Sequence, residues 1–247
     1  MQNLKIERKV IATDVDGVLL SWQSGLPYFA QKYNLPLEHI LDMIQDDKFV
    51  EPGKLFGCDD SLGKQLIEKY NCSDFIRYLA PYIDALRQVN KLKKTHDFVA
   101  VTALGNSIDA RLNRQFNLNA LFPGAFQDVY MCGHDESKEI ILTKVRLKYG
   151  SRVKFYVDDL AHHCDSAADI LNCPVYWMPR GERDVVSVKG TKVKDWDHIS
   201  ELESKKGRDS RIFDDILLNE RIINMSKWTK PIDEDTLKAY YRTPNGW

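Results

Sequence analysis

The sequence predicts an α/β protein with a Rossmann-like parallel sheet that carries helices on both faces. Short apolar runs recur along the chain, helical patterns separate them, and polar residues follow the ends of the runs. Strands that alternate with helices favour a parallel sheet covered on both sides. Continuous apolar runs are typical of strands buried on both faces. The runs that we interpret as core strands are residues 10–12, 98–102, 153–157 and 174–178.

Two of the segments between these runs have the periodicity of amphipathic helices. Residues 82–92 place Ile83, Leu86 and Val89 on one expected face. Apolar residues three or four positions apart share one face of a helix. Residues 136–147 repeat this pattern with the apolar side chains of Ile140, Ile141, Val145 and Leu147. We expect both apolar faces to pack against the sheet.

A helical insertion is predicted after the first strand. About 80 residues separate the first apolar run from the second, and one crossover helix needs far fewer. We therefore assign residues 21–74 to a small helical cap, and residues 1–20 and 75–205 to the core domain. Lys205-Lys206-Gly207-Arg208 is interpreted as a linker. We expect residues 206–247 to be a helical C-terminal extension with an aromatic tail, through which the chain could form a homo-oligomer.

Within the insertion, residues 36–44 and 62–70 have helical patterns. The pair Pro52-Gly53 and the later Gly57 are predicted to interrupt the chain between these helices, because proline and glycine break helical patterns. The cap therefore consists of at least two short helices.

The composition restricts the class of protein. The chain has 247 residues, with 35 Lys and Arg against 36 Asp and Glu, a formal net charge of −1. Without an overall basic field, we expect no stable nucleic-acid complex. The five cysteines are odd in number and form no C-x-x-C pair, which favours a reduced, cytoplasmic chain. No apolar run approaches the roughly 20 residues of a membrane span, and residues 1–9 do not resemble a signal peptide.

Asp14 and Asp16 directly follow the first apolar run, and Gly17 allows the chain to turn sharply after them. Two carboxylates this close are costly in an apolar setting unless they share a cation or a proton. One carboxylate can attack phosphorus while its neighbour protonates the leaving oxygen. The alternative is a turn with two solvated aspartates.

Two further side chains have the chemistry to bind a phosphoryl group. Thr102 ends the second apolar run, where its hydroxyl could hold a phosphoryl oxygen, although an ordinary strand-end threonine is the alternative. Lys138 lies near the start of a helix, where the dipole disfavours a cation. This placement suggests that Lys138 neutralises phosphate, against the alternative of a solvated surface lysine. Lys144, deeper in the same helix, is the second candidate for this role.

Asp158 and Asp159 end the third apolar run. Adjacent acids at the end of a buried strand repel one another unless a cation is near. Mg²⁺ prefers one or two carboxylates together with water and substrate phosphate. We therefore predict a magnesium site here. The alternative is a helix N-cap followed by one solvated acid.

The order of these residues resembles the haloacid dehalogenase-like (HAD) superfamily. An Asp-x-Asp-Gly segment follows the first strand, and a threonine, a lysine and an acid pair come later, each at a strand end or a helix start. The resemblance covers about residues 8–202. It implies that Asp14 is the nucleophile and that Asp16 is the general acid and base. Members without the second aspartate tend not to be phosphatases, so Asp16 implies a phosphatase.

The same resemblance implies how the ligands are distributed. Thr102, Ala103 and Lys138 would bind the phosphate. The cofactor would be Mg²⁺, bound by Asp14, Asp16, Asp158 and Asp159, with Asp16 contributing its backbone carbonyl. The insertion occupies the first cap position of the family. A cap in this position excludes bulk water and selects the leaving group.

The substrate implied is a small phosphorylated metabolite. Residues 75–81 resemble a stretch that precedes the threonine motif in the 5′(3′)-deoxyribonucleotidase family, which makes a nucleoside monophosphate the leading expectation. The chain departs from that family at residues 82–84, where Pro-Gly is usual, and at Ala103, where serine is common. A sugar phosphate or a nucleic-acid 3′-phosphate is the alternative substrate. The residues expected to bind substrate are Trp22, Phe29, Phe49 and His163.

Three other interpretations fit the sequence less well. Residues 57–64 have five residues between their glycines instead of the four of a P-loop, and Gln65 replaces its Ser or Thr. Residues 162–165 (His-His-Cys-Asp) are adjacent on one helix and cannot all face one ion. A receiver domain has its acid pair on the first strand, whereas here the pair comes last. A non-catalytic binding protein of the HAD type remains the alternative from another class.

Overall fold

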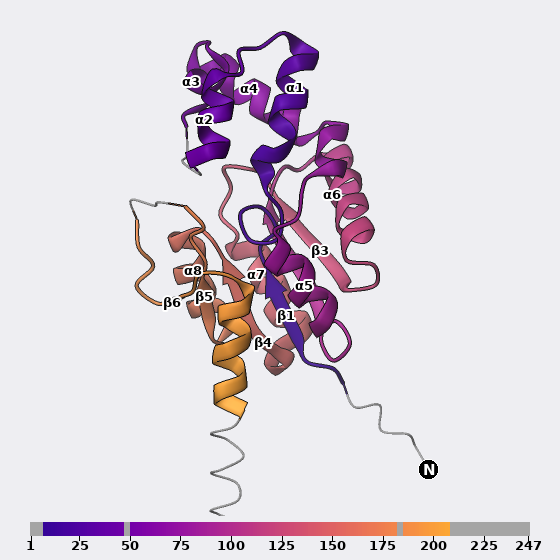
Figure 1. Cartoon of the computed structure of the whole chain (residues 1–247). Coiled ribbons are helices and arrows are strands. Elements are labelled where there is room, and N and C mark those ends of the chain that lie inside the picture. Colours follow the sequence, from indigo (N-terminus) through magenta and orange to yellow (C-terminus); the bar gives the residue numbers. More distant parts are fainter. Residues whose placement is uncertain (1–6, 47–49, 182–184, 208–247) are drawn as a thin grey trace, which may run out of the picture. The chain divides into compact units, whose positions relative to one another are not determined.

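The computed structural model describes residues 7–46, 50–181 and 185–207. Its strands form one parallel sheet in the order β3-β2-β1-β4-β5-β6 (Figure 1). Their bounds are Val10–Thr13 (β1), Asp97–Ala103 (β2), Phe126–Cys132 (β3), Val153–Asp158 (β4), Val175–Trp177 (β5) and Thr191–Lys192 (β6). The central strand β1 pairs in parallel with β2 on one side and β4 on the other. The predicted α/β fold is confirmed.

Different helices cover the two faces of the sheet. Successive side chains of a strand point to opposite faces. Val10 and Ala12 of β1 belong to the core that α7 (Glu139–Tyr149) and α8 (Ala161–Leu171) form with the sheet. On the other face Phe98 lies against Trp196, with ring centroids 6.2 Å apart. The helix α5 (Ile83–Leu92) approaches Trp196 there, since the Trp196 backbone N–H donates to Asp84.

Four of the strands coincide with the apolar runs of the sequence, and two do not. β3 reads Phe-Gln-Asp-Val-Tyr-Met-Cys, and most of its side chains are only half-buried because it lies at the edge of the sheet. Its polar residues interrupt the apolar signal. β6 has only Thr191 and Lys192, and both are exposed.

The apolar faces predicted for α5 and α7 are partly wrong. Ile83 at the start of α5 is 70% exposed, and Ile140 and Leu147 of α7 are 71% and 81% exposed. Each helix buries fewer apolar side chains than its sequence contains. Only the side chains that face the sheet or the neighbouring helix are shielded from water. The buried side chains of α7 are Ile141, Leu142, Val145 and Tyr149.

The insertion between β1 and β2 is helical. Its helices are η1 (Trp22–Gly25), α1 (Leu26–Tyr33), α2 (Glu38–Asp46), α3 (Pro52–Phe56), α4 (Asp60–Asn71) and η2 (Asp74–Tyr78). Pro52 and Gly53 do not interrupt the chain but begin α3, where proline is favoured because the first helical N–H needs no partner. Gly57 ends α3 in the left-handed conformation, as expected of a helix-terminating glycine.

Two hydrogen-bonded segments connect the insertion to the rest of the chain. The Ser21 N–H donates to the Ala80 carbonyl over 2.9 Å, and the Tyr82 N–H donates to the Leu19 carbonyl over 3.0 Å. The outgoing and returning segments therefore lie side by side. The returning segment also contacts α6 (Ile108–Leu121), which follows β2.

The chain divides into two compact units, Met1–Ser200 and Glu201–Trp247. Residues 196–207 are helical, so the helix that begins at Trp196 continues through residues 205–207 of the predicted linker. Residues 208–247, which include nearly all of the predicted extension, lie outside the described part of the chain. No helix among the described residues has the length and apolarity to span a membrane.

Candidate active site

The carboxyl ends of β1, β2 and β4 open into a cavity of about 670 Å³. From β1 the sheet grows to one side through β2 and β3 and to the other side through β4, β5 and β6. Open α/β sheets bind ligands at such a topological switch point. The volume lies in the range of small-molecule sites. Core residues and residues of the insertion both line the cavity, so the insertion lies over the strand ends.

Lys138 connects two aspartates at the floor of this site. Its Nζ lies 2.8 Å from Asp14 Oδ2 and 2.8 Å from Asp158 Oδ2, and its side chain is fully buried. Lys138 directly precedes α7, whereas Lys144 lies exposed on that helix. The structure therefore brings Lys138, and not Lys144, to the acids.

The three charges shift one another's protonation. Burial raises the pKa of Asp14 well above its usual range, and the nearby Asp158 and Asp159 add to this shift while Lys138 opposes it. Burial also works against ionisation of Asp158, but Lys138 and the hydrogen bond from Tyr156 hold its pKa below the usual value. The pKa of Lys138 is raised, because Asp14 and Asp158 outweigh the effect of its burial. Lys138 is therefore a permanent cation.

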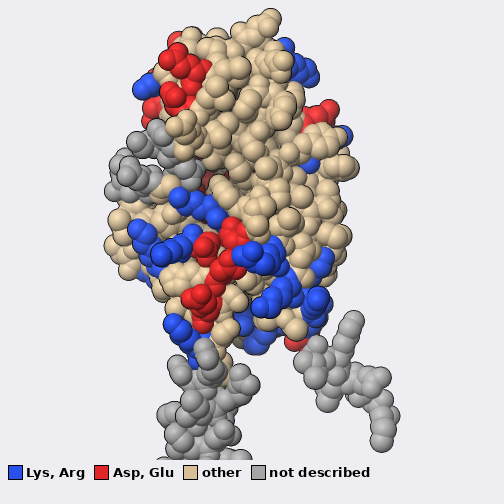
Figure 2. All heavy atoms as spheres, viewed as in Figure 1, with Lys and Arg blue, Asp and Glu red and all other residues tan. Residues whose placement is uncertain are grey.

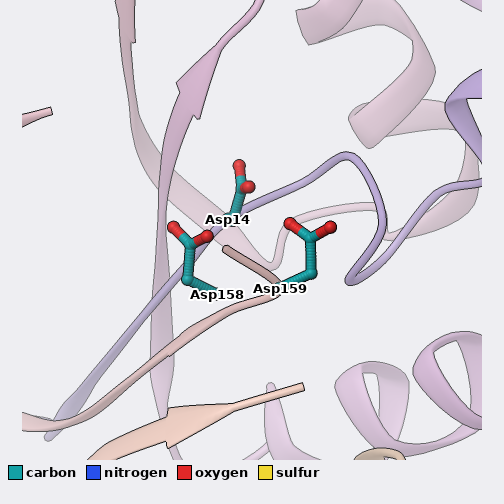
Figure 3. Close-up of side chains that lie close together, drawn as sticks. All are labelled: Asp14, Asp158 and Asp159. Atoms are coloured by element: carbon teal, nitrogen blue, oxygen red, sulfur yellow. The ribbon is translucent and has the colours of Figure 1, made fainter. Parts of the chain in front are cut away.

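Asp14, Asp158 and Asp159 form the group of possible metal ligands found among the described residues (Figure 3). Their carboxylates project in the same direction from the ends of β1 and β4, and one oxygen of each lies within 4.8 Å of the others. All three are buried, with Lys138 as the ammonium between two of them. Such a cluster fits a divalent cation, because like charges this close are otherwise costly.

The hydrogen bonds distinguish the two acids at the end of β4. Asp158 Oδ2 accepts from Lys138 and Tyr156, and Asp158 Oδ1 accepts from the Leu160 N–H over 2.9 Å. Both oxygens of the Asp158 carboxylate therefore already accept hydrogen bonds from the protein. Asp159 lines the cavity beside Asp14, whereas Asp158 does not. Asp14 and Asp159 are accordingly the better placed direct ligands.

Gly17 makes room for the Asp159 carboxylate. Its φ is +75°, a left-handed conformation that favours glycine. A Cβ at this position would lie 2.6 Å from Asp159 Oδ2. The turn after Asp16 therefore requires glycine both for its backbone and for its contact with the acid pair.

Thr102 and Ala103 at the end of β2 both line the cavity. Thr102 is fully buried, and no described residue hydrogen-bonds to its Oγ1. Buried polar atoms normally have a partner. The Thr102 hydroxyl in the wall of the cavity is therefore a donor without a partner among the described residues.

Asp16 lines the same cavity with a side chain that is 21% exposed. Both of its carboxylate oxygens lie 2.6 Å from Nη2 of Arg114, a residue of α6. Arg114 has no local sequence signal for this role, because it follows Asp16 by 98 residues and belongs to none of the motifs.

The structure places the residues expected to bind substrate in different surroundings. Trp22 and His163 line the cavity. Burial lowers the pKa of His163 to about 4, so this imidazole is neutral at neutral pH. Phe29 is fully buried among the rings of the cap, including Tyr70 and Phe56, so its assignment to substrate is wrong. Phe49 lies outside the described residues.

Sequence reasoning also missed a cation that holds the turn after Asp16. Arg180, which follows β5, donates from Nε to the Gly17 carbonyl over 3.1 Å and from Nη2 to the Val18 carbonyl over 3.0 Å. Its guanidinium also pairs with Asp84 at 2.8 Å and lies over the Tyr82 ring. Arg180 therefore holds the backbone of this turn, although it does not line the cavity itself.

Comparison with known sequences finds a relative in a bacteriophage. No protein-family model matches the chain. It is 64% identical over 208 residues to an uncharacterized 32.4 kDa protein of Enterobacteria phage T4 encoded in the Gp30-rIII intergenic region, covering 82% of this chain and 74% of the phage protein.

Solved structures with low identity share the architecture. The magnesium-bound HAD-hydrolase YfnB of Bacillus subtilis matches with a TM-score of 0.55 and 14% identity, over 79% of this chain and 98% of that one. A predicted phosphatase from Clostridium acetobutylicum matches with a TM-score of 0.52 and 15% identity, over 79% and 99%. The L-2-haloacid dehalogenase PA0810 gives 0.53 and 16%, over 81% and 100%. The chain thus belongs to the family of the phage T4 protein and has the fold of the HAD superfamily.

Proposed function

We propose that the chain is a Mg²⁺-dependent phosphomonoester hydrolase that works through an aspartyl-phosphate on Asp14. The observation that carries this proposal is the fully buried Lys138 between Asp14 and Asp158, together with the Thr102 hydroxyl in the wall of the same cavity, which is unpartnered in the described part of the chain. A phosphoryl group brings negative charge to its site, and catalysis of its transfer depends mainly on positioned cations and donors. The site supplies both next to a carboxylate nucleophile.

In the first step a carboxylate oxygen of Asp14 attacks phosphorus, and the bond from phosphorus to the leaving oxygen breaks. Asp16 gives its proton to that oxygen, so an alcohol departs. In the second step water attacks the phosphorus of the aspartyl-phosphate and Asp16 takes its proton. Inorganic phosphate and the free Asp14 carboxylate are the products.

The remaining residues stabilise charge and geometry. Lys138 and Thr102 bind the phosphoryl oxygens, together with the backbone at Ala103. Mg²⁺, held by Asp14, Asp159 and the Asp16 carbonyl, would neutralise the charge that develops on those oxygens. Asp158 keeps Lys138 in place through their 2.8 Å contact.

A nucleoside monophosphate is the substrate that the cavity supports best. The insertion contributes mainly apolar walls, from Trp22, Met43, Leu55 and Ile67. Apolar and aromatic walls suit the faces of a base, whereas a sugar needs many polar partners. A sugar phosphate or a nucleic-acid 3′-phosphate is the second candidate. In Figure 2 most of the upper half of the visible face is uncharged, and acidic and basic side chains lie next to one another in its lower half, so this face does not have the single-sign surface that favours a polynucleotide.

Halide displacement, the chemistry named for PA0810, is the competing reaction, because a carboxylate such as Asp14 can also attack carbon. The group Asp14, Asp158 and Asp159 favours phosphoryl transfer instead, because attack on a neutral carbon creates no phosphoryl charge for a cation to neutralise. A non-catalytic binding protein is less consistent with a site in which every proposed catalytic position is filled.

A substrate screen tests the proposal. Phosphate release from nucleoside monophosphates, sugar phosphates, a 3′-phosphorylated oligonucleotide and p-nitrophenyl phosphate is measured with Mg²⁺, and chloride release from 2-chloropropionate serves as the comparison. The expected result is phosphate release that is fastest with a nucleoside monophosphate and absent in Asp14→Asn. Failure to hydrolyse any phosphomonoester would refute the phosphatase, and preference for a sugar phosphate would refute only the substrate class.

A further inference from the structure

Arg114 is an unusual residue to find inside this protein. Its side chain is fully buried, and Asp16 is the acid with which it pairs. Among the described residues, no acceptor lies within hydrogen-bond distance of its Nε or Nη1. A guanidinium has five N–H donors, so most of its hydrogen-bonding capacity is unused.

This arrangement is poorly explained by stability. Burying a guanidinium has a desolvation cost of several kcal/mol, which is recovered only with good geometry and full hydrogen bonding. A buried pair with unmatched donors does not meet that condition. What the pair holds in place explains it better.

Arg114 lies between two other buried polar residues on the same face of α6. Asn113 donates from Nδ2 to the carbonyls of Cys72 and Ser73 over 3.1 and 2.9 Å. Asn117 donates to the carbonyl of Leu79 over 3.3 Å. The carbonyls of Cys72 and Ser73 lie between α4 and η2 at the end of the insertion, and that of Leu79 directly follows η2. One face of α6 thus binds both residues 72–79, where the insertion joins the core, and the side chain of Asp16.

We propose that Arg114 is a positioning residue for the phosphatase reaction proposed above, on which this inference rests. It keeps the Asp16 carboxylate oriented into the cavity beside Asp14 and ties that orientation to the segment joining cap and core. Without Arg114, the Asp16 side chain, which is 21% exposed, is free to turn toward solvent. Arg114 itself does not line the cavity and acts on the substrate only through Asp16.

Loss of Arg114 should affect one step, the protonation of the leaving oxygen. Asp16 must protonate the leaving oxygen of an alkyl phosphate, whose alkoxide is a poor leaving group. The p-nitrophenolate anion leaves without a proton. Misplacing Asp16 should therefore slow phosphorylation of Asp14 by a nucleoside monophosphate and have little effect on phosphorylation by p-nitrophenyl phosphate. A loss of general folding would slow both.

The test measures the first turnover of each substrate in Arg114→Met, in Asp16→Asn and in the double variant. Arg114→Met should lose at least roughly tenfold on the nucleotide and less than about threefold on p-nitrophenyl phosphate, because general acids contribute about 10²–10⁴-fold. In the Asp16→Asn background, adding Arg114→Met should change the nucleotide rate by less than about threefold, since its effect acts through Asp16.

Controls keep the outcomes distinct. Arg111→Met removes an exposed arginine of the same helix that donates to the Val129 carbonyl, and it should keep both rates. Arg114→Lys retains the charge and should recover part of the nucleotide rate. It also carries the same leaving-group comparison if the methionine variant fails to fold. Equal losses on both substrates, or a further loss in the Asp16→Asn background, would overturn the inference. An inactive wild type would overturn the proposed function and this inference together.

Discussion

Replacing Lys138 with methionine tests the electrostatic balance of the site. Methionine approximates the length of lysine but removes the charge that contacts Asp14 and Asp158 at 2.8 Å each. Removing one partner of a buried pair costs about 3–5 kcal/mol, because the other charge stays buried without compensation. At about 2–4 °C per kcal/mol for a unit of this size, Tm should fall by roughly 6–20 °C at neutral pH.

The loss should depend on pH with a definite sign. Without Lys138, burial raises the folded-state pKa of both carboxyls above the value in the unfolded chain. The folded state then binds more protons than the unfolded state, so stability falls as pH rises through this range. The Tm difference from wild type should be smaller at pH 5 than at pH 7.5. Phosphatase activity should fall by about 10²–10³-fold, the usual effect of removing a group that stabilises transition-state charge.

Thermal unfolding at the two pH values and kcat/KM for p-nitrophenyl phosphate measure these effects. Lys144→Met is the matched control, since Lys144 lies exposed on α7 and should change neither quantity. A methionine variant at position 138 with wild-type stability and activity at neutral pH would show that the buried ion pairs do not have the role assigned to them here.

Three further predictions address the nucleophile, the metal and the cavity. Asp14→Asn should abolish turnover without lowering Tm, because it removes one of three clustered buried charges; retention of more than about a tenth of the activity would exclude Asp14 as nucleophile. Excess EDTA should abolish activity and Mg²⁺ restore it, and Asp159→Asn should raise the Mg²⁺ concentration required; full activity in chelator would contradict the metal site. Trp22→Leu should reduce kcat/KM for a nucleoside monophosphate more than for p-nitrophenyl phosphate, whereas Phe29→Leu should reduce Tm and spare this ratio. Equal effects of Trp22→Leu on both substrates would argue against base stacking.

The central strands could be predicted because their physical requirement is local. A strand covered on both faces must be apolar at consecutive positions, and β1, β2, β4 and β5 carry that signal. The edge strand β3 has no such requirement. Its polar residues Gln127 and Asp128 interrupt the apolar run, so the sequence does not predict this strand. The exposed Ile140 and Leu147 show the converse limit, because a count of apolar residues cannot say which of them face the sheet.

Some residues of the candidate site could likewise be predicted from local sequence, and others could not. Asp14, Thr102, Lys138 and Asp158 could be nominated because each stands at a strand end or a helix start, and these positions converge in a parallel sheet. Phe29 could not be judged, because an aromatic ring serves a small core as readily as a ligand. Arg114 and Arg180 could not be found from sequence, because their partners at residues 16–18 are distant along the chain and only the tertiary fold brings them together.

Gly17 shows how a residue without functional groups can shape a candidate active site. Any side chain there would collide with the Asp159 carboxylate, and the left-handed backbone would be strained as well. In a saturation mutagenesis experiment, most substitutions at position 17 should therefore reduce activity, as those at Asp14 should. Such a profile would give the false impression that Gly17 takes part in the chemistry, although its contribution is the space that it leaves empty.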